Sequence, residues 1–195
     1  MKKKMTRIGN IGTIIRLSLL LMLVCGLLYP LALTGVAQVV SPEQANGSLI
    51  YDQQGEVIGS ELIGQSFADP SFFQSRVSSI NYDGAGSGSN NYAPSNPELK
   101  MRVQESIAAW QATNPDVPIA DLPSDLLTNS GSGLDPHITP AAAEAQIPRI
   151  SKRTGVPEIE LRQLVEQHTE GRELGLFGSP RVNVLKLNLD LQKRI

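Results

Sequence analysis

Cysteine and aromatic residues are scarce in this chain of 195 residues, which has one cysteine and only 5% Phe, Trp and Tyr. A single cysteine, Cys25, excludes a disulfide within the chain, so any folded domain must be held together by packing alone. Few aromatics, together with 17 glycines and 13 prolines, indicate a small core with long ordered loops. The roughly 155 residues after the apolar N-terminal stretch suffice for one domain.

Motifs for nucleotide binding and serine hydrolysis are also missing. In the Gly-rich run 84–92, Gly84 and Gly86 fit a dinucleotide fingerprint, but Ser89 stands where its third glycine belongs. No Gly-Lys-Ser/Thr follows, and no serine has glycines two residues before and after it, as a nucleophile elbow needs. We therefore expect an ordered surface loop whose Ser and Asn side chains satisfy its own backbone.

Charge is absent from one long stretch, 17–41, which is rich in leucine. A bilayer core of about 30 Å needs roughly 20 mostly apolar residues in one helix, and the segment from Thr13 to Val36 has 24. We expect a short basic cytoplasmic tail over residues 1–12, a transmembrane helix over 13–36 and an extracytoplasmic domain over 37–195.

The flanking charges set this orientation, because short Lys- and Arg-rich flanks stay in the cytoplasm. Five cations and no acid precede the apolar stretch: Lys2, Lys3, Lys4, Arg7 and Arg16. They leave 12 of the 17 Lys and Arg residues to balance all 19 Asp and Glu residues. Such an acidic outer part argues against a nucleic-acid partner.

A cleaved signal peptide is the alternative interpretation of the same stretch. The basic start, the apolar core, the helix breaker Pro30 and the small residues of Gly35-Val36-Ala37 fit its three regions. Cleavage after Ala37 would release a soluble exported domain, either a binding domain or a hydrolase.

The rest of the chain predicts an α+β domain, with a small sheet and helices packed on it. A hairpin is expected over 48–63, turning at Asp52-Gln53-Gln54-Gly55. Asn96-Pro97 should open a helix that ends by Asn114-Pro115. The apolar stripe of this helix places the only tryptophan in the core: Leu99, Val103, Ile107 and Trp110.

Two further helices and a strand are expected toward the C-terminus. The first helix begins after Thr139, is limited or kinked by Pro148 and ends at Gly155; the second begins at Pro157 and has His168 at its end. The β-branched run after Gly178 predicts a last strand that pairs with the first hairpin. Asn188 should cap a short final helix.

The loop 130–137 is the most site-like segment of the chain. Ser132, Asp135 and His137 suggest a hydrolase triad, but neighbours in one loop rarely converge as a Ser–His–Asp relay. One His and one Asp are too few ligands for a metal, and His168 is remote in sequence. We expect no catalytic residue and no metal site here, but a structural or partner-contact loop made of Ser130, Gly131, Ser132, Gly133, Leu134, Asp135, Pro136 and His137.

Several sequence runs together resemble the C subunits of the bacterial Kdp potassium-transporting P-type ATPase. The resemblance covers essentially the whole chain, including the single N-terminal helix. It rests on the following runs and pairs: Gly47-Ser48-Leu49-Ile50, Gly59 to Phe67, Phe72-Phe73 with Arg76, the loop 87–97, Ser130 to Ile138, Gln146 with Arg149, and Gly178 to Asn188. The chain departs from the family pattern in two loop segments, at 76–79 and within 87–97.

The resemblance implies a non-catalytic subunit of a high-affinity potassium uptake complex in the bacterial inner membrane. The complex uses ATP, magnesium and potassium, and it contains a channel-like A subunit, an ATP-hydrolysing B subunit and a small F subunit. The C subunit is implied in assembly and as a catalytic chaperone that raises the ATP affinity of the B subunit. The candidates that the resemblance implies for contact with ATP are Ser87, Gly88, Ser89 and Asn90. No cofactor is expected to be held by this chain itself.

Overall fold

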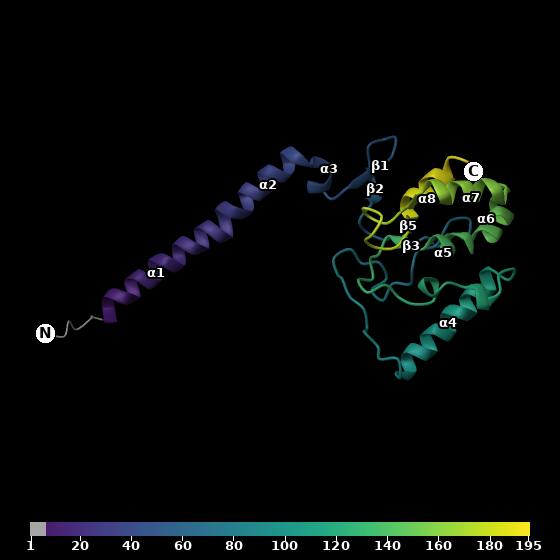
Figure 1. Ribbon diagram of the computed structural model, residues 1–195, viewed down its shortest axis with the longest axis horizontal. Coiled ribbons are helices and arrows are strands. Elements are labelled where there is room, and N and C mark those ends of the chain that lie inside the picture. The colour runs from purple at the N-terminus through teal and green to yellow at the C-terminus, as the bar shows by residue number, and fades with distance from the viewer. Residues whose placement is uncertain (1–6) are drawn as a thin grey trace. The chain divides into compact units, whose positions relative to one another are not determined.

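The structure, a computed structural model, describes residues 7–195 and divides into two units that meet between Ser48 and Leu49. Half of the expected cytoplasmic tail, residues 1–6, therefore lies outside the described residues. The first unit is helical over most of its described residues, and the second is a mixed domain of helices and short strands, as Figure 1 shows.

The first unit is one long helix followed by a single turn. It comprises α1 (Arg7–Leu23), the π-helical turn η1 (Val24–Leu28), α2 (Tyr29–Val40) and the short α3 (Pro42–Ala45). The stretch Ile11–Val40 is long and apolar enough to cross a membrane. At 1.5 Å per residue it rises about 45 Å, more than a bilayer core of about 30 Å requires. The expected span 13–36 lies inside it.

Pro30 does not break this helix. Proline has no N–H and its ring crowds the preceding turn, so an α-helix must adjust around it. Here the turn before Pro30 widens: the N–H of Tyr29 donates to the carbonyl of Val24, five residues back. Such π turns are rare and occur mostly as a single turn inside an α-helix, as here.

The domain begins with the expected hairpin. Strand β1 (Leu49–Tyr51) pairs antiparallel with β2 (Val57–Ser60). The carboxylate of Asp52 accepts hydrogen bonds from the N–H groups of Gln54 and Glu56 across the turn. A long stretch with little regular structure follows and leads to α4 (Pro97–Thr113). Asn96 caps this helix by accepting from the N–H of Glu98 at 2.8 Å.

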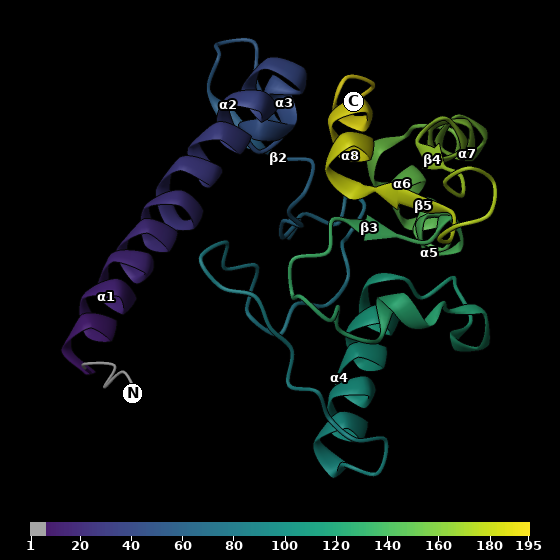
Figure 2. The ribbon, with the colours of Figure 1, turned by 60° about the vertical axis from the view of Figure 1, so that its left-hand side comes forward.

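The C-terminal half carries most of the core. Its elements are the single turns η2 (Ile119–Asp121) and η3 (Ser124–Leu126), β3 (His137–Ile138), α5 (Pro140–Glu144), α6 (Ile147–Thr154), α7 (Glu158–Gln167), β4 (Thr169–Glu170), β5 (Arg181–Asn183) and α8 (Val184–Gln192). The strands form an antiparallel sheet in the order β3-β5-β4. Figure 2 shows α5, α6, α7 and α8 gathered around it.

Buried side chains from these helices and strands make one core, with Phe73 added from the irregular stretch and Trp110 from α4. The α+β class is therefore confirmed, as are the burial of Trp110, the helix end at Gly155 and the break near Pro148, where α5 and α6 separate.

Two expectations about the C-terminal segment were wrong. Strand β5 pairs with β3 and β4 instead of the first hairpin, which forms a sheet of its own. The strand also ends early: Asn183 is the cap, accepting from the N–H of Lys186 at 3.2 Å. The residues after it, the β-branched Val184 included, become helical because they bury a helical face consisting of Val184, Leu185, Leu187, Asn188 and Leu191.

Candidate functional site

The two loops singled out in the sequence lie against each other. The N–H of Gly88 donates to the carbonyl of Ser132 at 2.8 Å, and the hydroxyl of Ser87 donates to the same oxygen at 3.3 Å. The amide of Asn129 donates to the hydroxyl of Ser89 at 2.5 Å. Asn90 donates instead within its own loop, to the Tyr92 hydroxyl at 2.7 Å. Three of the four residues implied for contact with ATP therefore bind the segment 129–132 of the same chain.

Ser78 fastens a third segment to this pair of loops. Its hydroxyl donates to the carbonyl of Gly133 at 2.6 Å and accepts from the N–H of Tyr82 at 2.9 Å. Gly133 has a φ of +74°, and a Cβ there would lie 2.6 Å from Cγ1 of Ile80. Both the backbone conformation and the space therefore require glycine at this point.

Asp135 is the charged centre of the loop 130–137. It lies 3.1 Å from Nη1 of Arg76, accepts from the N–H of His137 at 3.0 Å and faces Nδ1 of His137 at 3.5 Å. Burial alone would raise the pKa of Asp135, but the hydrogen bonds from His137 and Arg76 outweigh it and hold the pKa below its usual value. The carboxylate thus links the loop to Arg76, on a segment 59 residues earlier.

A shallow cavity of about 260 Å³ opens beside this carboxylate. Charged groups of both signs line it, among them Arg76, Asp125, Asp135 and Arg181. Asp125 is already engaged, because it accepts from the N–H of Thr139 at 2.8 Å. The cavity therefore has no strong excess of either charge with which to select an ion.

Of the three groups of the hydrolase alternative, only Asp135 and His137 come together. The hydroxyl of Ser132 accepts from the N–H of Leu134 at 3.1 Å, and no hydrogen bond joins it to His137 among residues 7–195. The imidazole of His137 faces Asp135, and among residues 7–195 no hydroxyl forms a hydrogen bond with it, whereas a catalytic serine must donate to its base. His168 lies at the end of α7, where Nε2 is 2.9 Å from the carboxylate of Asp190. Over the described residues, no three His, Cys, Asp or Glu side chains gather as a metal would require.

Buried amides form a second network, which the sequence analysis did not anticipate. Asn188 accepts from the N–H of Phe73 and donates to its carbonyl, both at 2.8 Å. Gln146 does the same for Gln74, at 2.7 and 3.1 Å. These amides take the place of a neighbouring strand for a backbone that has none. The sequence does carry a signal for such buried amides, namely a polar residue on an otherwise apolar helix face. Asn188, between Leu187 and Leu191, is an example.

Arg149, on α6, completes this network and is only 5% exposed. Its guanidinium donates to Asn114, to Gln146 and to the carbonyls of Pro70 and Phe72. All these acceptors are neutral. Burial, followed by the nearby charge of Arg153, lowers the pKa of Arg149 to about 10.

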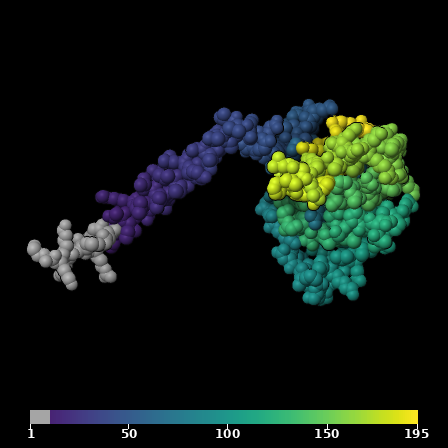
Figure 3. All heavy atoms as spheres, viewed as in Figure 1, coloured from purple at the N-terminus to yellow at the C-terminus, as the bar shows by residue number. Residues whose placement is uncertain are grey.

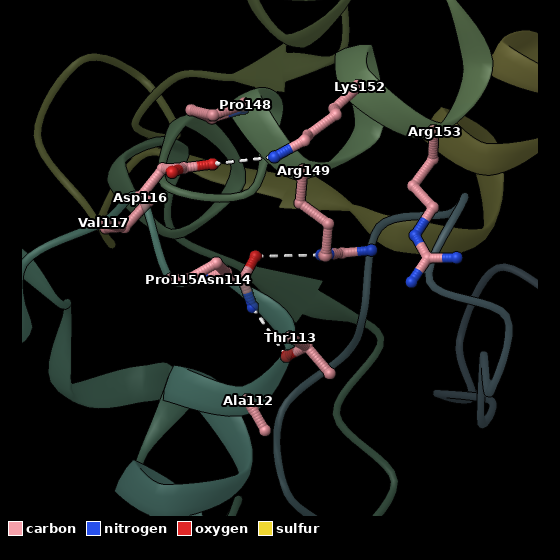
Figure 4. Close-up of a pocket in the computed structure, with 10 residues that line it drawn as sticks. All are labelled: Ala112, Thr113, Asn114, Pro115, Asp116, Val117, Pro148, Arg149, Lys152 and Arg153. Atoms are coloured by element: carbon pink, nitrogen blue, oxygen red, sulfur yellow. Dashed lines mark hydrogen bonds and ion pairs between the residues drawn. The ribbon is translucent and has the colours of Figure 1, made fainter.

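A cavity of about 340 Å³ lies between the end of α4 and α6, lined by Arg149, Lys152 and Arg153 among others (Figure 4). In this view the guanidinium of Arg149 meets Asn114, and Lys152 reaches Asp116 at 3.8 Å. The two contacts join α6 to the residues that follow α4, so the cavity wall is part of the structural network.

Comparison with known proteins shows the family of the chain. Residues 11–193 match the family model described as "KdpC: K+-transporting ATPase, c chain". Curated proteins named "Potassium-transporting ATPase KdpC subunit" are 59% identical in Bacillus cereus strain B4264, 58% in B. cereus strain Q1 and 58% in Bacillus anthracis strain A0248. Each alignment covers 94% of this chain and 95% of the relative. The chain belongs to the KdpC family of potassium-transporting ATPase subunits.

Proposed function

We propose that this chain is a non-catalytic accessory subunit of an ATP-driven potassium uptake complex, anchored by its helix with the domain outside the cytoplasm. The observation that carries the proposal is that the polar side chains of the two loops are engaged within the chain itself. Ser87, Ser89 and Asp135 each hold another segment of the same chain, so these groups build a surface and are not left free for chemistry.

The proposed partners are a channel-like A subunit, an ATP-hydrolysing B subunit and a small F subunit. The helix Ile11–Val40 supports an intramembrane contact, because its large apolar side chains are exposed within the chain itself. Such side chains need lipid or a partner helix around them. Assembly is then the simplest role for the chain, because the helix can join the membrane subunits while the loops meet their outer surfaces.

We further propose that any effect on ATP affinity passes through contacts between subunits. A domain outside the membrane cannot touch nucleotide in the cytoplasm, and the five N-terminal cations favour that orientation. The loop also offers little to a phosphate, since the N–H of Gly88 donates to Ser132 and the hydroxyl of Ser89 accepts from Asn129. A bias on a two-state equilibrium of the B subunit needs no such contact.

The test is an affinity pull-down of the full chain, tagged at its C-terminus, from detergent-solubilised membranes of potassium-starved cells. Intact mass then reads the state of the N-terminus. We expect an uncleaved chain together with an ATPase subunit and a channel-like subunit. A chain that arrives alone and begins near Gln38 would support the cleaved, soluble alternative and overturn the proposal.

A second measurement separates direct from indirect action on ATP. Photoreactive ATP at cellular concentration is added to the detergent-purified complex, and the labelled chains are identified. Label on the ATP-hydrolysing subunit alone is expected. Saturable label on residues 87–90 of this chain would refute indirect coupling.

A further inference from the structure

Three large apolar side chains are left in solvent at the connection between β4 and β5. Leu174 is 89% exposed, Leu176 is 75% and Phe177 is 64%. Isolated exposed apolar residues are ordinary, but three within four residues are not. We call residues 174–177 the apolar tip; Figure 3 shows the yellow-green atoms of this segment at the surface of the domain.

The apolar tip is held in one conformation. Glu173 and Phe177 exchange two backbone hydrogen bonds, at 2.9 and 3.0 Å, across a three-residue turn. Leu174 has a φ of +52° and Gly175 a φ of +73°. A left-handed conformation is unusual for leucine, and glycine would adopt it more readily. The turn thus keeps an apolar side chain where the backbone alone would favour glycine.

Ion pairs fix the residues that flank the apolar tip and balance their charge. We call these flanking residues the base of the tip: Glu170, Arg172, Glu173 and Arg181. Arg181 lies 3.0 Å from the carboxylate of Glu170 and 3.4 Å from that of Glu173. With Arg172, the base has two cations and two anions. Loops that dock on anionic lipid carry an excess of positive charge, and this one has none. A preformed shape with a neutral base instead suits an apolar recess in a protein.

We propose that the apolar tip inserts into an apolar recess on another protein subunit of the potassium-transporting ATPase. This inference rests on the proposed function, because it needs the complex to exist. Leu176 and Phe177 would be the buried anchors, surrounded by the balanced charges of the base. Such apolar centres with polar rims are typical of protein interfaces.

The first experiment places the photoreactive residue benzoylphenylalanine at position 177 of the full chain in native membranes. The same residue at position 159, on α7, is the matched control, because Ile159 is 63% exposed. We expect a crosslink to a protein subunit of the complex from position 177 and none from position 159. Crosslinks to lipid only, or no crosslink from position 177, would overturn the proposal.

A double variant, Leu176→Ser with Phe177→Ser, tests the energetic role, with Ile159→Ser as its control. We expect at least a tenfold loss of recovered complex for the double variant and no loss for the control. Thermal unfolding of the purified chains verifies that both variants fold. Full recovery by the folded double variant contradicts the role of the tip, whereas failure of the unaltered chain to recover any complex contradicts the proposed function.

Discussion

At the scale of single residues, the interior is organised by a few amides. Asn188 satisfies both backbone groups of Phe73, which lies in the core without a strand beside it. An unpaired buried donor or acceptor costs about 1–3 kcal/mol. We therefore expect Asn188→Leu to lower the free energy of unfolding by about 2–5 kcal/mol, since both groups lose their partner. Urea unfolding measures the difference.

Gln192→Leu is the control for this change, since Gln192 is on the same helix but exposed. It should alter the unfolding free energy by less than about 0.5 kcal/mol, as surface substitutions usually do. Equal effects of the two substitutions would mean that the Asn188 amide bonds add nothing to stability.

Asp135 leads to a prediction about the stability of the fold at low pH. Its pKa is lowered in the folded chain, so its contribution to stability is present above the unfolded carboxyl pKa of about 3.9 and is lost as the pH falls through the folded pKa. At neutral pH, Asp135→Asn should cost about 1–3 kcal/mol, because it weakens hydrogen bonds to a charged acceptor. The cost should shrink below about pH 4.

Urea unfolding at pH 7 and at pH 3 verifies this sign. Asp121→Asn serves as the comparison, because Asp121 is exposed and the described residues give its side chain no hydrogen bond or ion pair. A penalty for Asp135→Asn that is as large at pH 3 as at pH 7 would show that the lost charge is not its source.

At the scale of elements, the sequence predicts best what is determined locally. Asn96-Pro97 starts α4 because both residues act on the adjacent backbone, and Asp52 to Gly55 makes the hairpin turn for the same reason. The end of β5 is different. Residues 182–184 favour a strand, yet the chain turns helical at Val184 because burying a helical face outweighs that preference.

The same distinction applies to the candidate site. Both polar loops are recognisable from their composition, but their contact is not, since Gly88 and Ser132 are 44 positions apart and meet through backbone atoms. Strands β3 and β4 have only two residues each, too few to leave a periodic pattern. The pairing of β5 therefore could not be found by local reasoning.

At the scale of the whole molecule, the main prediction is the side of the membrane on which the domain lies. The chain offers a clean probe, because its one cysteine, Cys25, lies within the apolar helix. Gln53 is exposed in the hairpin turn, so Gln53→Cys adds a single accessible thiol. A membrane-impermeant maleimide should label this variant in intact cells and leave the unaltered chain unlabelled.

The outcome also decides between mechanisms of action on ATP. Labelling from outside puts the loops 87–90 and 130–137 on the side opposite the nucleotide, and only coupling through subunits or the membrane helix then remains. Labelling only after lysis would reverse the topology argued from the N-terminal cations. Direct contact between the Gly88 loop and ATP would then become possible, although the hydrogen bonds to Ser132 would first have to break.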